Sequence, residues 1–181
     1  MGNKNKSRPR PQSSRSALSD DDELYKWQGE YGYGRKVPAS RIKKLARSRH
    51  LDSNRRADAW ELLAFIYSDR SQNDLANDAH DQAFKIGRSS EYLVSKVDFL
   101  RDRGIEEALE LLKRVNVSEL SKHSRVWFWI SWMDTAIQSF NAKVLEEAIG
   151  KIWKRDLNDM LVRSSRTRCV RLLRMLRKYR C

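Results

Sequence analysis

The stretch ADAWELLAFIYSDRSQNDLANDAHDQAFKIGRSS, residues 57–90, is expected to decide the fold, because it contains two amphipathic helical patterns in succession. In the first pattern, the spacing i, i+3, i+4, i+7 places on one helical face Trp60, Leu63, Ala64 and Tyr67. In the second pattern, the corresponding face carries the small residues Ala76, Ala79 and Ala83. The stretch therefore predicts two helices joined by a short polar turn, with large residues of the first facing small residues of the second.

The order of these residues also resembles a known repeat. A Trp, a Leu, a small residue and a Tyr, followed by small residues at Ala76 and Ala83, are typical of one unit of the tetratricopeptide repeat (TPR). His80 stands where the repeat has an aromatic residue, and no proline closes the unit. The resemblance implies an all-α fold of right-handed helical hairpins, for which we expect about seven or eight helices.

Two further helical pairs are predicted after this unit. The second pair spans about residues 89–115, and the third spans about residues 122–140 and 142–155. The segment RVWFWISWMDTAIQSF within the third pair is apolar almost all round, so it is expected at the centre of the domain. One of its faces would carry Trp127, Ile130, Ile137 and either Met133 or Asp134. This pair also resembles the half-TPR repeats of RNA-processing proteins.

Length and composition predict one domain with tails, because 181 residues can build one substantial core. Residues 1–23 are expected to be a disordered basic arm that ends in an acidic run, because the arm has almost no apolar residues to bury. Residues 24–39 are rich in Gly and aromatic residues and predict an irregular segment. Residues 40–181 are expected to form a single helical-repeat domain that ends in a basic amphipathic helix over about 158–179.

The net charge of +13 is distributed unevenly along the chain. Residues 1–50 carry +8, residues 51–150 carry −4, and residues 151–181 carry +9. A basic excess confined to the two ends indicates contact with a polyanion. The unit at 57–90 carries more acidic than basic residues, so it is expected to be a scaffold rather than a phosphate contact.

Two helices hold the candidate phosphate contacts. A short helix that begins near Ser40 presents Arg41, Lys43, Lys44 and Arg47. The last helix gathers on one side Arg163, Arg166, Arg171, Arg174, Arg177 and Lys178. Arginine favours bidentate hydrogen bonds to phosphate and stacking on bases. The helix also has no acidic residue after Asp159.

These patterns predict a nucleic-acid-binding protein, with RNA favoured over DNA. Tyr31 and Tyr33 are either anchors that pack on the first helices or aromatic platforms for exposed bases. The alternative is an adaptor whose helical groove or acidic middle binds a protein, while the basic ends bind acidic proteins. An anionic membrane surface is less favoured, because the last helix lacks a Trp or Phe to sit at the interface. Whether the two basic elements share one surface separates these alternatives.

The sequence lacks the motifs of an enzyme. Residues 1–181 contain no Gly-rich phosphate loop, nucleophile elbow, HExxH or CxxC motif, so we expect neither catalysis nor a metal or cofactor. The three histidines, His50, His80 and His123, are scattered and are expected to be surface or turn residues. Two cysteines distant from any His, with no apolar signal sequence at the start, favour a soluble protein of the cytoplasm or nucleus. The pattern predicts no oligomeric state.

Overall fold

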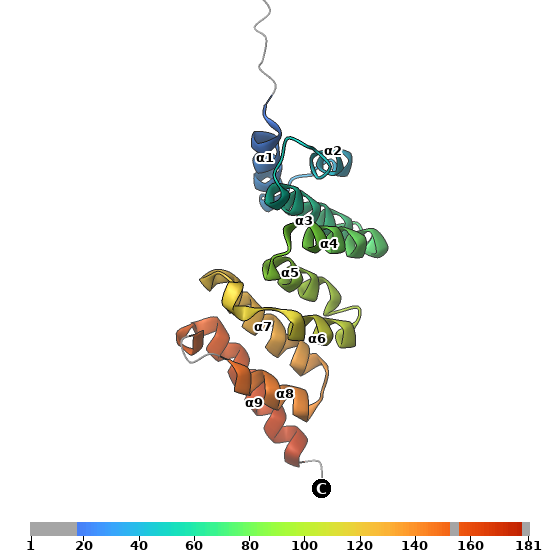
Figure 1. The fold of residues 1–181 in the computed structure, drawn as a ribbon. Coiled ribbons are helices and arrows are strands. Elements are labelled where there is room, and N and C mark those ends of the chain that lie inside the picture. Colours follow the sequence, from blue (N-terminus) through green and yellow to red (C-terminus); the bar gives the residue numbers. More distant parts are fainter. Residues whose placement is uncertain (1–17, 153–155, 179–181) are drawn as a thin grey trace, which may run out of the picture.

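The described part of the chain, residues 18–152 and 156–178, contains nine α-helices, two short 3-10 turns and no strand in this computed structural model. The helices stack in chain order from α1 (Asp20–Gly32) at one end to α9 (Met160–Lys178) at the other (Figure 1). The all-α prediction is confirmed. The count exceeds the expected seven or eight because the chain is already helical at Asp20.

Helix α1 corrects the prediction of an irregular segment over residues 24–39 and of an arm that extends to residue 23. The Ser19 side chain accepts a hydrogen bond from the Asp22 backbone N–H and so caps the helix. The acidic run then occupies the first turn, where carboxylates complement the positive end of the helix dipole. Residues 1–17 of the predicted arm lie outside the described residues. Only residues 33–38 connect α1 to the short helix α2 (Ala39–Leu45) without regular structure.

Helices α3 (Ser53–Asp69) and α4 (Asn73–Gly87) are the predicted central pair. Asp52 caps α3 by accepting a hydrogen bond from the Arg55 backbone N–H at 2.8 Å. The predicted small residues of α4 are fully buried, as are Leu63 and Ala64 of α3. Trp60 and Tyr67 are only partly buried, so the large residues of this face lie at its edge.

The end of α4 depends on Gly87 for space rather than for backbone freedom. The left-handed conformation that ends the helix belongs to Arg88, one residue later, which has a φ of 52°. A Cβ atom on Gly87 would collide with the ring of Tyr92 and lie 2.8 Å from the Cβ of Ala57. Helices α3, α4 and α5 (Ser90–Leu100) therefore meet at Gly87 too closely for any side chain.

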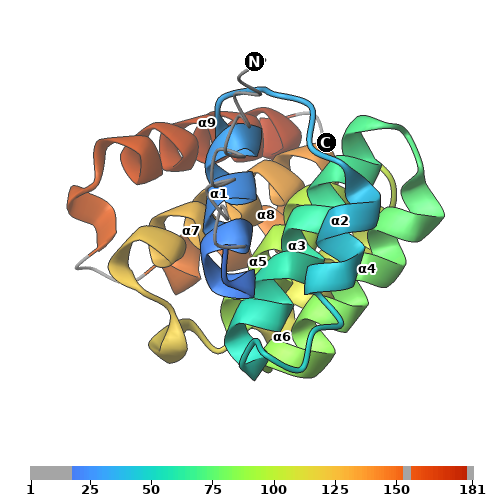
Figure 2. The same ribbon diagram turned by 90° about the horizontal axis from the view of Figure 1, so that it is seen from above.

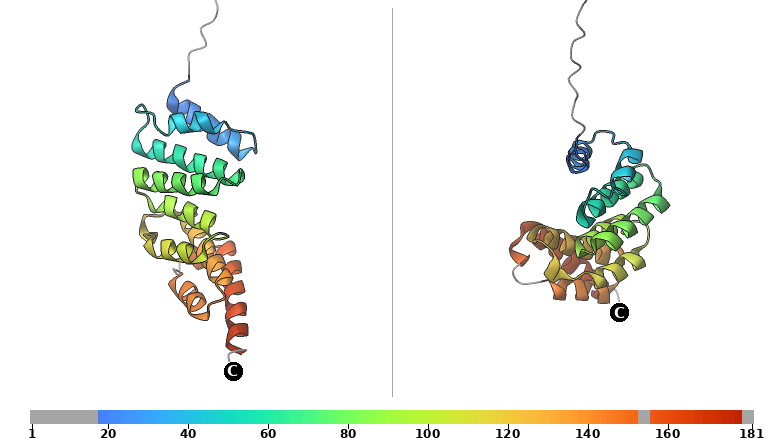
Figure 3. Two further views of the ribbon diagram at one scale, coloured as in Figure 1. Left: turned by 90° about the vertical axis from the view of Figure 1, so that its right-hand side faces the viewer. Right: turned by 45° about the horizontal axis from the view of Figure 1, so that its top comes forward.

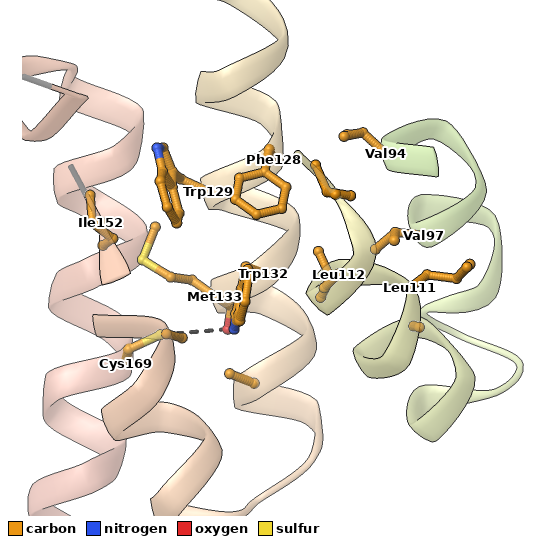
Figure 4. Close-up of a cluster of buried hydrophobic side chains, with 14 of the residues drawn as sticks. Val94, Val97, Leu111, Leu112, Phe128, Trp129, Trp132, Met133, Ile152 and Cys169 are labelled. Atoms are coloured by element: carbon orange, nitrogen blue, oxygen red, sulfur yellow. Dashed lines mark hydrogen bonds between the residues drawn. The ribbon is translucent and has the colours of Figure 1, made fainter. Parts of the chain in front are cut away.

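Helix α7 (Lys122–Gln138) lies at the centre of the C-terminal half, between α5 and α6 (Ile105–Arg114) on one side and α8 (Ala142–Lys151) and α9 on the other. Figure 4 shows its buried side chains, Phe128, Trp129, Trp132 and Met133, between these two groups. The central position agrees with the prediction, but the face is different. Trp127, expected inward, is 45% exposed, whereas Phe128, Trp129 and Trp132 occupy the buried side of the helix.

Hydroxyl groups connect the successive helices α3, α5 and α7 through carboxylates. Each bond runs from a hydroxyl on the later helix to a carboxylate on the earlier one, at 2.5–2.9 Å: Tyr92 to Asp58, Ser95 to Glu61, Ser124 to Glu91, and Ser131 to Asp98. Burial raises the pKa of Glu61 and of Asp98 above their ordinary values. We call this set the hydroxyl–carboxylate ladder.

His80 of α4 is 1% exposed, which corrects its prediction as a surface or turn residue. Its ring lies 5.8 Å from the ring of Phe65 and 5.2 Å from that of Phe99, between centroids. Neither ring nitrogen has a hydrogen-bond partner among the described residues. Burial, with a smaller contribution from Lys96, lowers the pKa of His80 to about 4. The histidine therefore takes the place of an aromatic core residue in its neutral form.

A His80→Leu variant should lose less stability in acid than the natural protein. Between pH 6.5 and about 4, the unfolded chain binds a proton at His80 that the folded protein does not, so folding weakens as the pH falls. The leucine variant removes this contribution, which amounts to at most about 3 kcal/mol. Thermal unfolding at pH 7 and pH 4.5 measures it. An equal Tm loss in both proteins over this interval would show that His80 titrates normally.

A Gly87→Ala variant should be less stable by about 1–3 kcal/mol, because the added methyl group meets Tyr92 and Ala57. The matched control is Gly29→Ala in α1, where a Cβ atom meets nothing within 4 Å. Alanine there should raise the stability by about 0.5–1 kcal/mol, because glycine is a poor helix former. Denaturant unfolding of both variants distinguishes the two effects, and an unchanged stability of Gly87→Ala would contradict the close approach.

Candidate nucleic-acid interface

Helix α9 presents its basic residues to solvent, as its periodicity predicts. Its apolar side is inward, with Val162, Cys169, Leu172 and Leu173 buried against α7 and α8. The Cys169 thiol donates a hydrogen bond to the Met133 carbonyl oxygen at 3.5 Å, which fixes this side of the helix on α7. The opposite side carries the six predicted cations, all exposed: Arg163, Arg166, Arg171, Arg174, Arg177 and Lys178.

Most of these cations have no ion-pair partner among the described residues. Arg177 forms an ion pair with Glu146 at 2.5 Å, and Arg168, outside the predicted set, forms one with Asp134 at 2.7 Å. The other five predicted residues make no ion pair or side-chain hydrogen bond within residues 18–152 and 156–178. Their positive charge is therefore available to a ligand. We call them, with Arg177, the α9 basic face.

The charge of the second predicted basic element, the short helix near Ser40, is partly neutralised. Helix α2 ends at Leu45, and Arg41 forms an ion pair with Glu23 of α1 at 2.5 Å. Lys43, Lys44 and Arg47 make no ion pair with the described residues. Together with Arg49 and His50, these residues line a hollow of about 890 Å³ between α1 and α2, which we call the α2 hollow.

The two basic elements lie at opposite ends of the stack. Figures 1 and 3 show α2 at one end and α9 at the other, with the intervening helices between them. Figure 2, seen along the stack, places α2 over α3 and α4 and α9 on the far side of the molecule. Folding therefore does not join the predicted cations into one continuous basic face, and this separation counts against the nucleic-acid prediction. Any phosphate contacts would have to be made at two separate elements.

The two tyrosines proposed for base stacking differ from each other. The Tyr31 ring packs against Phe65 at 6.3 Å, and its hydroxyl donates a hydrogen bond to Asp69 at 2.8 Å. Burial and this bond raise the pKa of Tyr31. Of its two expected roles, Tyr31 therefore has that of an anchor, which holds α1 on α3, and not that of a stacking platform. Tyr33 is 83% exposed and is available for contact.

A groove beside α2 contains aromatic residues that sequence reasoning assigned only to the repeat core. It has a volume of about 540 Å³ and lies between α2, α3 and α4, lined by Lys43, Arg47, Trp60, Tyr67, Leu75 and Asp78. The Arg47 guanidinium carbon lies 6.0 Å from the centroid of the Trp60 ring. The sequence contains the two cations and the two aromatic residues, but they are not adjacent in it. Whether they lie close together depends on how α2 crosses α3. We call this site the aromatic groove.

A third concavity has the opposite charge. Asp58, Glu61, Glu91 and Asp98 of the hydroxyl–carboxylate ladder line a groove of about 270 Å³, with Trp127 at its side. The Trp127 indole N–H donates a hydrogen bond to His123 at 2.9 Å. This acidic groove lies on α3, α5 and α7, and therefore between the two basic elements in the stack.

None of the described helices has the length and apolar composition needed to cross a membrane. Over the same residues, no cluster of His, Cys, Asp and Glu side chains has the arrangement of a metal site. Compared with known proteins, the chain matches no protein-family model, no curated protein and no solved structure at a significant level.

Proposed function

We propose that this protein is a non-enzymatic nucleic-acid-binding protein, with RNA favoured over DNA, that uses its basic elements for phosphate contacts. The α9 basic face carries the proposal, because five cations on one helix side have no partner within the described residues. A face that served only solubility would mix acidic and basic residues. Arginine rather than lysine on this face also suits phosphate, because its planar guanidinium group can donate two parallel hydrogen bonds to two phosphate oxygens.

The scaffold in this proposal is a TPR-like array of right-handed helical hairpins. The short connections support pairs formed by α3 with α4, α5 with α6, and α7 with α8. In such an array the last helix covers the open end of the core, so α9 combines a capping role with the proposed phosphate contacts. Capping explains its apolar side, whereas phosphate binding explains its charge.

Replacement of Arg166, Arg171 and Arg174 by Glu should abolish retention of the protein on RNA or heparin columns. The three side chains are exposed and unpaired within the described chain, so the fold should be unaffected. Residual binding should depend less on salt, with the slope of log K against log salt concentration smaller by about 2, at about 0.7 per lost phosphate contact on a single strand. Fluorescence anisotropy with labelled RNA at several salt concentrations measures both effects.

The matched control replaces Lys85, Lys122 and Lys143 by Glu, which changes the net charge by the same amount. These lysines are exposed, and they lie on α4, α7 and α8 rather than on a proposed basic element. The control should keep most of its RNA affinity. Equal losses in both variants would assign the binding to net charge alone, and intact binding in the arginine variant would remove the α9 assignment.

The acidic groove favours a second candidate function, that of a protein-interaction adaptor. Its four carboxylates and the exposed Trp127 suit a basic peptide segment, while the basic ends would bind acidic proteins. Purification from cells with and without nuclease separates the two functions. Protein partners that survive the nuclease support the adaptor, whereas nucleic acid that co-purifies without nuclease supports the first proposal.

A further inference from the structure

The aromatic groove has the size and the composition of a nucleotide site. Its volume of about 540 Å³ lies within the range of about 300–1,000 Å³ that is usual for small-ligand sites. Its wall contains two aromatic rings, the 44% exposed side chain of Leu75, and the cations Lys43 and Arg47. Apolar and aromatic surface beside positive charge matches a nucleotide, which combines a flat base with an anionic phosphate.

Trp60 and Tyr67 provide the flat surface. They are seven residues apart on α3 and therefore share one side of the helix, and both are partly exposed. The Trp60 indole N–H and the Tyr67 hydroxyl make no hydrogen bond within the described chain. Their polar groups are therefore available to a bound group, while both side chains also pack against the buried core formed by α1, α2 and α3.

Lys43 and Arg47 connect the aromatic groove to the α2 hollow, because both side chains line both concavities. Neither forms an ion pair with a described residue. Beyond them, the α2 hollow continues with Lys44, Arg49 and His50. The α2 hollow also contains the carboxylates Asp20 and Glu23, of which Glu23 is paired with Arg41. A phosphate backbone that crosses α2 would therefore contact Lys43 and Arg47, the two cations that the concavities share.

We propose that the aromatic groove binds an unpaired base of single-stranded RNA, which stacks on Trp60 or Tyr67 while the adjoining phosphates contact Lys43 and Arg47. This inference rests on the proposed function and adds the substrate class, a single strand rather than a duplex. Bases inside a duplex are already stacked on their neighbours, so only an unpaired base can enter the groove. Asp78 lines the same groove and is placed to accept a hydrogen bond from the exocyclic amino group of a base.

Binding to three oligonucleotides of eight residues tests the substrate class with the natural protein. The probes are a single-stranded oligoribonucleotide, its duplex, and an oligomer of ribose phosphates without bases. The single strand should bind about 5- to 150-fold more tightly than the base-free oligomer for each base that stacks, although both carry the same phosphates. It should also bind more tightly than the duplex.

Ultraviolet crosslinking with the same single strand locates the contact. Trypsin cleaves after Arg56 and Arg70, so a single peptide, residues 57–70, contains both Trp60 and Tyr67. We expect this peptide to carry the crosslinked nucleotide. A Lys43→Glu/Arg47→Glu variant should lose the crosslink and weaken binding of the single strand, whereas the control Lys85→Glu/Lys122→Glu should keep both.

Two results would overturn the inference while leaving the proposed function intact. One is equal affinity for the oligomers with and without bases. The other is the absence of a crosslink on residues 57–70 when the protein is saturated with the single strand. In that case the aromatic groove would bind a different class of ligand. Failure of all three probes to bind at low salt would instead overturn the proposed function together with the inference.

Discussion

The close contact between α3 and α4 is the constraint on which the rest of the structure depends. Helix α4 presents to α3 the small side chains Ala76, Ala79 and Ala83 beside the buried ring of His80, and it ends on a glycine that leaves no room for a Cβ atom. Because the two helix backbones approach so closely, the large residues of α3 are displaced to the edges of the interface. Trp60 and Tyr67 therefore remain partly exposed beside α2, and the same packing that holds the pair together also produces the aromatic groove.

The sequence predicted the elements whose signals are local. The spacing of apolar residues indicated the pair α3 and α4, because a helical apolar face repeats within a few residues. Helix α1 was missed because two glycines and several tyrosines resemble a loop. The Ser19 cap, the acidic first turn and the burial of Leu24 outweigh the cost of those glycines. His80 was missed because its identity suggested a polar surface, whereas its position on α4 faces the rings of Phe65 and Phe99.

The candidate site was predictable only in part, for a similar reason. The cations of α9 follow from periodicity, since a helix with one apolar side must expose the other. The distance of these cations from α2 depends on how the intervening helices stack. The spacing of residues in the sequence does not predict that stacking. The aromatic groove depends on the crossing of α2 over α3, and its aromatics had been assigned to the core. Tyr31 shows the opposite case. It lies beside a basic segment and was a candidate for base stacking, but its side chain is held by Phe65 and Asp69.

The hydroxyl–carboxylate ladder has an electrostatic consequence for a long ligand. Its four acceptors hold negative charge on α3, α5 and α7, the helices that separate α2 from α9. At physiological salt, charges interact over about 8 Å, so the two basic ends are screened from one another. A phosphate chain attached at one end would be repelled along this intervening face. The acidic helices thus separate the two basic elements electrostatically. Under the proposed function, α2 and α9 would bind two separate segments of nucleic acid instead of one continuous strand.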